Sequence, residues 1–238
     1  MQHQMEMLQK HIDFLKSLDT EEFYDKDEDE VQQYAHNAIQ EIIQLKHDAT
    51  PDLLKLLSTD FTWSCFFALT VLRSTKDPYA VTGIITFLKK ESDDSMANEE
   101  AMLALQDIGD PSIPLLIEEL EEAFSHKTYN SYIVGALTGI IGPASYEFMV
   151  NTTKDFIENH GWYKGWFHID DFTYNFVVQE RQEPISLLKQ VLDMKTITST
   201  EKREIHDTIR ALEDPDAYQK EIEGIAEELS DDTHKHDG

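Results

Sequence analysis

Few residues of this 238-residue chain are spaced as calcium-binding or catalytic motifs require. The carboxylates of Asp25, Asp27 and Asp29 imitate the start of a calcium-binding loop. The position that needs a sharp turn is Glu30 instead of glycine, and the closing ligand position is His36 instead of glutamate. Because the match breaks twice, a loosely held divalent ion is the most that this segment suggests. We predict no metal site.

Two other groups contain residue types that can carry out chemistry. His168, Asp170 and Asp171 could bind a metal ion or transfer a proton, but three polar residues in one loop are common in proteins. Cys65 has no identifiable histidine partner and falls on an apolar stripe, which favours a core thiol over a nucleophile. The zinc-peptidase, serine-hydrolase, P-loop and dinucleotide motifs are absent from the sequence. No catalytic residue and no cofactor are therefore predicted.

An aromatic segment at residues 160–172 lengthens one interval of the chain and contains two of its three tryptophans. Gly161 and Gly165 would allow the backbone to turn there. Insertions in repeat proteins often lie at a binding edge, and tryptophan and tyrosine are frequent binding hot spots. The alternative is that the rings fill an irregular gap between repeats. The hypothetical binding residues are Trp162, Tyr163, Trp166, Phe167 and His168.

The charge of the chain is strongly negative. It has 47 Asp and Glu against 20 Lys and Arg, and no Lys or Arg occurs from Glu91 to His126. Such a field repels phosphate, so we expect no nucleic-acid partner. The acids either form a face for a basic protein partner or only keep the chain soluble. The hypothetical acidic surface comprises Glu91, Asp93, Asp94, Glu99, Glu100, Glu118, Glu119, Glu121 and Glu122.

Six of the seven prolines recur at intervals of 27 to 41 residues, and this spacing predicts the elements that must hold these candidate sites. Most follow a short polar junction, in which Asp or Thr can cap a helix and proline can occupy its first turn. A recurrence of about 30–45 residues is typical of stacked helix pairs. The six positions are Pro51, Pro78, Pro111, Pro143, Pro184 and Pro215.

Apolar stripes of helical period flank these junctions, which predicts an all-α fold. Residues 173–178 have β propensity, but they also continue a helical stripe, so we predict a helix there. Ile117 lies on one stripe and is predicted to be in the core. Around Pro78 the stripes are Cys65, Ala68, Leu69 and Leu72, then Val81, Ile84, Ile85 and Leu88; around Pro111 they are Ala101, Ala104, Leu105 and Ile108, then Ile113, Leu116, Ile117 and Leu120.

The segment 104–111, Ala-Leu-Gln-Asp-Ile-Gly-Asp-Pro, followed by the stripe that begins at Ile113, resembles the HEAT-type repeats. The similarity is greatest to the short repeats of phycobilisome-lyase-like proteins, and residues 209–215 are a weaker copy. The resemblance implies a right-handed α-solenoid of about five to six antiparallel helix pairs. Since HEAT repeats serve many unrelated functions, it says little about activity.

The pattern divides the chain into three predicted parts: an N-terminal capping helix and acidic connector at 1–30, a repeat domain at 31–229 and a disordered acidic tail at 230–238. No run of about 18 apolar residues and no leader is present, so we expect neither a membrane partner nor export. A single cysteine suits a reducing compartment, and the predicted location is cytoplasmic. The oligomeric state is left open.

Two function classes follow from these patterns. The favoured one is a non-catalytic scaffold or adaptor that mediates protein–protein interaction, with a basic partner on its acidic surface. The alternative, implied by the resemblance, is a binder of small molecules such as bilins, or a lyase-type enzyme. No compact motif in the sequence carries this second class, so a protein without enzymatic activity is favoured.

Overall fold

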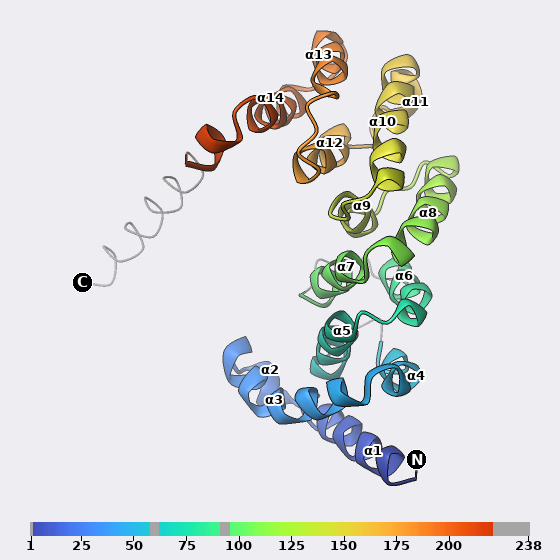
Figure 1. The fold of residues 1–238 in the computed structure, drawn as a ribbon, viewed down its shortest axis with the longest axis vertical. Helices are drawn as coiled ribbons and strands as arrows, with labels where there is room; N and C mark the ends of the chain where they lie inside the picture. The colour runs from blue at the N-terminus through green and yellow to red at the C-terminus, as the bar shows by residue number, and fades with distance from the viewer. Residues whose placement is uncertain (1, 58–61, 91–95, 221–238) are drawn as a thin grey trace, which may run out of the picture. The chain divides into compact units, whose positions relative to one another are not determined.

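The computed structural model describes residues 2–57, 62–90 and 96–220 (Figure 1). Within these ranges every regular element is a helix, so the predicted all-α class is confirmed. The chain forms two compact units, Met1–Ile140 and Ile141–Gly238. The boundaries that the sequence suggested at residues 30 and 229 stay a prediction. No helix in the described ranges is both long and apolar enough to cross a membrane.

The first unit contains α-helices joined in part by short 3-10 turns. Its elements are α1 (Gln2–Lys16), α2 (Glu21–Tyr24), α3 (Glu28–Leu45), η1 (Lys46–Ala49), α4 (Thr50–Leu54), α5 (Trp63–Thr75), η2 (Pro78–Ala80), α6 (Val81–Lys90), α7 (Met96–Ile108), η3 (Asp110–Ser112), α8 (Ile113–Ser125) and α9 (Ser131–Thr138). The second unit contains α10 (Pro143–Glu158), α11 (His160–Tyr163), α12 (Ile169–Val178), α13 (Ile185–Asp193) and α14 (Ser199–Glu213).

The junction before α6 shows how a proline turn separates two helices. Lys76 ends α5 in the left-handed conformation, with φ of 50°. The side chain of Asp77 then accepts a hydrogen bond from the backbone N–H of Tyr79 at 3.1 Å, and Pro78 begins η2. The other oxygen of the fully buried Asp77 accepts the hydroxyl hydrogen of Thr50. One carboxylate thus caps a turn and connects it to α4, as the sequence predicted for its capping role.

The junction before α8 uses different chemistry. Gly109 has a φ of 76°, which a residue with a side chain rarely adopts. Asp110 belongs to η3 and does not act as the predicted cap. Instead the buried Ser112 donates its hydroxyl hydrogen to the carbonyl of Leu105 at 3.0 Å. After α14, Asp214 accepts from the backbone N–H of Ala217 at 3.1 Å, in agreement with the predicted cap.

Helices of the first unit contact one another in a regular order. Helix α3 contacts α1 and α5, and α7 contacts α5 and α9 (Figure 1). The intervening helices pack against this row, α4 on α5, α6 on α7 and α8 on α9. The predicted stripes on α5, α6 and α7 are buried. Each helix therefore hides its apolar side against its neighbours.

The second unit has its own apolar core. Helix α12 contacts α10 and α14, and α13 contacts α10 and α14. Phe156, Phe172 and Phe176 are almost completely buried. Residues 173–178 belong to α12, so the predicted helix is confirmed in spite of their β propensity. Tertiary packing of Phe172 and Phe176 on one side of α12 outweighs the local preference for a strand.

The N-terminal segment is part of the first unit. Leu8, Ile12 and Leu15 are buried where α1 meets α3 and α5. In the predicted connector, Asp19 accepts hydrogen bonds from the backbone N–H of Ser64 at 2.9 Å and from its hydroxyl at 2.6 Å. These bonds connect the segment to the first turn of α5. The acidic tail predicted at 230–238 lies outside the described residues.

Ile117 was predicted to be a core residue. Its side chain is only half-buried, however, whereas that of the neighbouring Leu116 is fully buried. We expect Leu116→Ala to lower the free energy of unfolding by about 2–5 kcal/mol, as other large-to-small core changes do. Ile117→Ala should cost less, since part of that side chain already contacts water. Urea denaturation of the two variants measures the difference. Equal losses would show that Ile117 belongs to the core after all.

Candidate functional site

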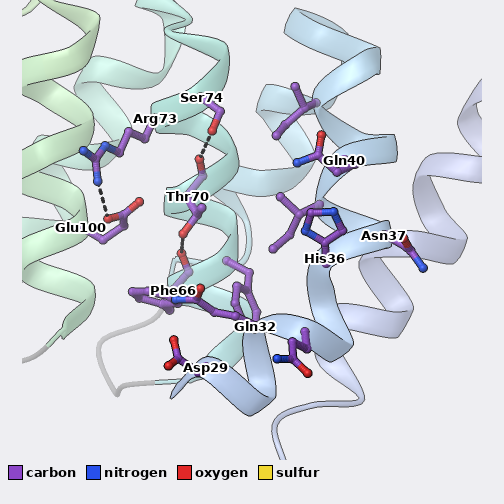
Figure 2. A pocket seen from close by; sticks show the side chains of 14 residues that line it. Asp29, Gln32, His36, Asn37, Gln40, Phe66, Thr70, Arg73, Ser74 and Glu100 are labelled. Carbon is purple, nitrogen blue, oxygen red and sulfur yellow. Dashed lines mark hydrogen bonds and ion pairs between the residues drawn. The ribbon is translucent and has the colours of Figure 1, made fainter. Parts of the chain in front are cut away.

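Residues of helices α3, α5 and α7 line an open groove in the first unit, with a cavity volume of about 840 Å³ (Figure 2). Most of its wall comes from α3 and α5, and α7 contributes one residue. The lining residues are Asp29, Gln32, Gln33, His36, Asn37, Ile39, Gln40, Ile43, Phe66, Phe67, Thr70, Arg73, Ser74 and Glu100.

The wall formed by α3 is rich in uncharged polar side chains. Gln32, His36 and Gln40 follow one another at four-residue intervals, which places them on one side of the helix, and Gln33 and Asn37 also line the groove. The side chains of Gln33, His36, Asn37 and Gln40 are exposed and make no hydrogen bond to the residues that the structure describes. The opposite side of α3 is anchored in the core by Val31, Ala35, Ala38 and Ile42.

The wall formed by α5 combines apolar rings with hydroxyl groups. Phe67 is fully buried and Phe66 nearly so, and they form the floor. The hydroxyl of Thr70 donates to the carbonyl of Phe66 at 3.1 Å, and that of Ser74 donates to the carbonyl of Thr70 at 2.9 Å (Figure 2). Since each hydroxyl has only one hydrogen, both groups offer the groove acceptor lone pairs.

An ion-pair network connects α5 with α7 beside the groove. The guanidinium of Arg73 donates to Asp107 through Nε at 2.7 Å and to Glu100 through Nη1 at 3.1 Å. Lys76 contacts the other oxygen of Asp107 at 3.1 Å. The hydrogen bond from Arg73, followed by that from Lys76, holds the pKa of Asp107 below its usual value. The positive charge of Arg73 is therefore offset by two carboxylates.

Asp29 lies at the end of the groove formed by the first turn of α3 (Figure 2). Its exposed carboxylate makes no ion pair or hydrogen bond with the described part of the chain. Arg73, the one cation among the lining residues, is paired with Glu100 and Asp107. The groove consequently offers an unneutralised negative charge at one end.

The groove was not predicted from the sequence, although a signal was present. Residues 32–40 contain five uncharged polar side chains on the exposed part of an otherwise amphipathic helix. In a chain with 47 acidic residues, such a stripe without charge is unusual. The packing of α3 against α5, however, is required to turn this stripe into one wall of a cavity.

Only some residues of the predicted acidic surface are exposed and without an ion pair in the described part of the chain. Glu91, Asp93 and Asp94 lie outside the described residues. Glu100 is buried, with 8% of its surface exposed, and pairs with Arg73, so its assignment to an open acidic face was wrong. Its burial comes from the packing of α7 against α5.

Lys89 of α6 reaches the acidic side of α8. Its Nζ lies 2.8 Å from Glu119 and 3.5 Å from Glu122. The hydrogen bond with Glu119, more than the nearby charges, keeps the pKa of Lys89 above its usual value. The exposed acids of the predicted set that have no ion pair with described residues are Glu99, Glu118 and Glu121.

The aromatic segment folds into the short helix α11 and the turn after it. Tyr163 and Phe167 are buried, with 3% and 4% of their surfaces exposed. Trp162 is 37% exposed, Trp166 is half-buried and His168 is exposed. The five predicted binding residues therefore divide between core and surface. Trp162 and Tyr163 are adjacent positions of α11 and point in different directions, whereas Trp166, Phe167 and His168 follow the helix.

Ring contacts hold this segment together. The Trp162 and Trp166 rings meet edge to face at 5.0 Å, and the Trp166 indole N–H donates to the Trp162 carbonyl at 2.7 Å. The Tyr163 hydroxyl donates to Asp155 at 2.5 Å. Burial, followed by this bond to a carboxylate, raises the pKa of Tyr163 well above its usual value. Gly165 has a φ of 88°, the turn that the sequence predicted.

The other candidate residues of the first unit lie on or next to α3 and α5. Asp25 and Asp27 precede α3, whereas Asp29, Glu30 and His36 lie on it, so most of the imitated calcium loop is a helix. Cys65 is fully buried, as predicted. Among the described residues, no group of three or more His, Cys, Asp or Glu side chains is arranged to hold a metal ion.

Asp170 is a half-buried carboxyl of the second unit whose pKa is shifted. Its Oδ1 is buried and has no hydrogen-bond partner in the described chain. Burial, with the nearby charges of Asp171 and Glu201, raises its pKa, against a smaller effect of its own backbone N–H and of His168.

Comparisons with protein-family models, curated proteins and solved structures gave no match for this chain. The resemblance to HEAT-type repeats therefore stays a prediction from residues 104–120, and the groove has to be interpreted from its own chemistry.

We expect the two faces of the aromatic segment to respond differently to truncation. Tyr163→Ala should lower the free energy of unfolding by about 3–5 kcal/mol, in the range of buried aromatic residues. Trp162→Ala should cost only about 1 kcal/mol, mainly through its ring contacts. Thermal denaturation distinguishes them, and acrylamide quenching reports whether Trp162 is accessible. A Trp162→Ala variant as unstable as Tyr163→Ala would assign both rings to the core.

The raised pKa of Asp170 predicts that ionisation of this carboxyl lowers the free energy of unfolding as the pH rises. The folded protein resists ionisation of this carboxyl, so the fold loses stability as the pH rises above the ordinary carboxyl value of about 4 towards the raised one. Asp170→Asn removes the ionisation. The variant should therefore gain stability relative to the natural protein between pH 3 and pH 7. A difference in the free energy of unfolding that is constant over this range would contradict the prediction.

Proposed function

We propose that this protein is a non-catalytic, HEAT-type helical-repeat scaffold that binds another protein in the groove between α3, α5 and α7. In this proposal the helices continue as a right-handed α-solenoid of about five to six pairs. The spacing of the prolines supports it, as does the order of contacts from α3 through α5 and α7 to α9. Stacked repeats of this kind expose extended surfaces for binding.

One observation carries the functional part of the proposal: the groove is lined by exposed side chains that have hydrogen-bonding capacity left. Gln33, His36, Asn37 and Gln40 have no protein partner in the described ranges. Small-molecule pockets are usually enclosed and mostly apolar, with few polar groups. An open groove with many uncommitted donors and acceptors is better suited to the polar surface of a polypeptide.

Charge supports a basic partner. The formal net charge of the chain is −27, and the cation in the groove is already paired. Association with a basic protein should accordingly slow down with added salt, because screening limits the reach of the field to about 8 Å near 0.15 M. The same charge disfavours DNA and RNA, whose non-specific affinity depends on contacts from Lys and Arg.

A site-specific photo-crosslinker tests the proposal in cells that produce the protein. A benzophenone amino acid at Gln40, inside the groove, should give a covalent adduct with a partner protein. The same group at Glu41, which is exposed on α3 but does not line the groove, is the matched control. We expect the adduct from position 40 only, and we expect fewer adducts when salt is added to a lysate before irradiation.

Two results would contradict the proposal. Equal adducts from both positions would show that the groove is not the binding surface. No protein adduct, together with a coloured or other small molecule that co-purifies and is found by mass spectrometry, would favour the small-molecule alternative.

A further inference from the structure

We infer that the groove binds an extended stretch of about six residues that carries Lys or Arg. The inference rests on the proposed function and specifies the chemistry of the partner segment. It depends on four features of the groove: its length, the spacing of the polar side chains along α3, the hydrogen-bonding groups of its two walls and the distribution of charge.

The length follows from the helix. The lining residues on α3 run from Asp29 to Ile43. With a rise of 1.5 Å per residue, these positions span about 21 Å. An extended chain advances about 3.4 Å per residue, so about six residues cover the same distance.

The spacing of the polar side chains matches such a chain. His36 and Gln40 lie four residues apart, about 6 Å along the helix axis. Side chains on one face of an extended peptide, and the main-chain groups between them, repeat every two residues, about 6.8 Å. Successive side chains of α3 can therefore meet equivalent main-chain groups of an extended segment.

The two walls together satisfy both kinds of main-chain group. A Gln side chain supplies a donor and an acceptor, and a neutral imidazole supplies one of each. The hydroxyls of Thr70 and Ser74 are left as acceptors for peptide N–H groups. Arg73 keeps N–H groups on Nη1 and Nη2 that no described residue uses, and these can donate to peptide carbonyls. A helical partner would have its main-chain groups already paired, so it could not use this wall.

The charge selects a basic segment. The carboxylate of Asp29 is exposed and unpaired within the described chain. At the other side of the groove, the charge of Arg73 is offset by Glu100 and Asp107. A Lys or Arg side chain near Asp29 gains an ion pair, whereas an acidic side chain there would be repelled.

The test uses the full chain and a capped heptapeptide, acetyl-Gly-Ser-Lys-Ser-Lys-Ser-Gly-amide. Two matched peptides isolate the two features: one replaces both lysines by glutamate, and the other carries N-methylated serines, which lack main-chain donors. Side-chain NH₂ signals in ¹⁵N-edited NMR spectra locate the binding, and the titration gives the affinity.

We expect the lysine peptide to shift the NH₂ signals of Gln33, Asn37 and Gln40. The N-methylated peptide should bind on the order of tenfold more weakly, because several hydrogen bonds are lost. The glutamate peptide should not bind.

Substitutions in the protein, instead of in the peptide, test the same contacts. His36→Ala together with Gln40→Ala should weaken binding on the order of tenfold, while Gln44→Ala, exposed on α3 beyond the groove lining, should have no effect. Asp29→Asn should weaken binding about two- to fivefold at low salt, and Glu41→Gln should not. These positions are all exposed, so the variants should fold, which circular dichroism verifies.

Three outcomes would overturn the inference: no binding of the lysine peptide, equal binding of the N-methylated peptide, or shifts only at residues outside the groove. None of these decides the proposed function. If crosslinks at Gln40 still captured a protein, the scaffold would remain supported and its partner would bind as a folded surface.

Discussion

The burial of α5 is the constraint on which the first unit depends. From Trp63 to Leu72 every side chain except the half-buried Thr70 is buried, so this helix is apolar around most of its circumference. A helix of this kind is stable in water only when neighbours cover it on several sides. Contacts with α1, α3, α4 and α7 supply that cover. The same contacts bring the polar stripe of α3 opposite Thr70 and Ser74 and so create the groove.

Ion pairs between helices that contact each other add to this apolar packing. Arg73 and Lys76 of α5 meet Asp107 of α7, and Lys89 of α6 meets Glu119 of α8. Acids of the stretch from Glu91 to His126, which contains no Lys or Arg, therefore form ion pairs with cations that precede this stretch in the chain. Pairing between alternate helices lowers the repulsion that a net charge of −27 would otherwise impose on the compact state. The exposed acids without an ion pair in the described chain are therefore fewer than the sequence suggests.

The aromatic segment shows a related division between packing and surface. Helix α11 and the turn after it place Tyr163 and Phe167 against Phe156 in the core and leave Trp162 partly in water. Packing filler thus describes Tyr163 and Phe167, while the binding edge stays a prediction for the residues that remain accessible. The groove of the first unit offers more free polar groups than this segment does, and it is the stronger basis for a function.

The sequence by itself determined the helical class, the buried stripes and the main turns. These features depend on local periodicity and on cap chemistry, as with Leu105, Asp77 and Gly165, and such information lies within a few residues of the chain. The tertiary structure alone decided which polar residues meet. Glu100 lies 27 positions from Arg73, with which it pairs, and Gln40 lies 30 positions from Thr70, with which it lines the groove, so no local pattern predicts either arrangement. The half-burial of Ile117 has the same cause. A stripe indicates which side of a helix is apolar, but the exposed fraction of each side chain depends on how closely the next helix packs.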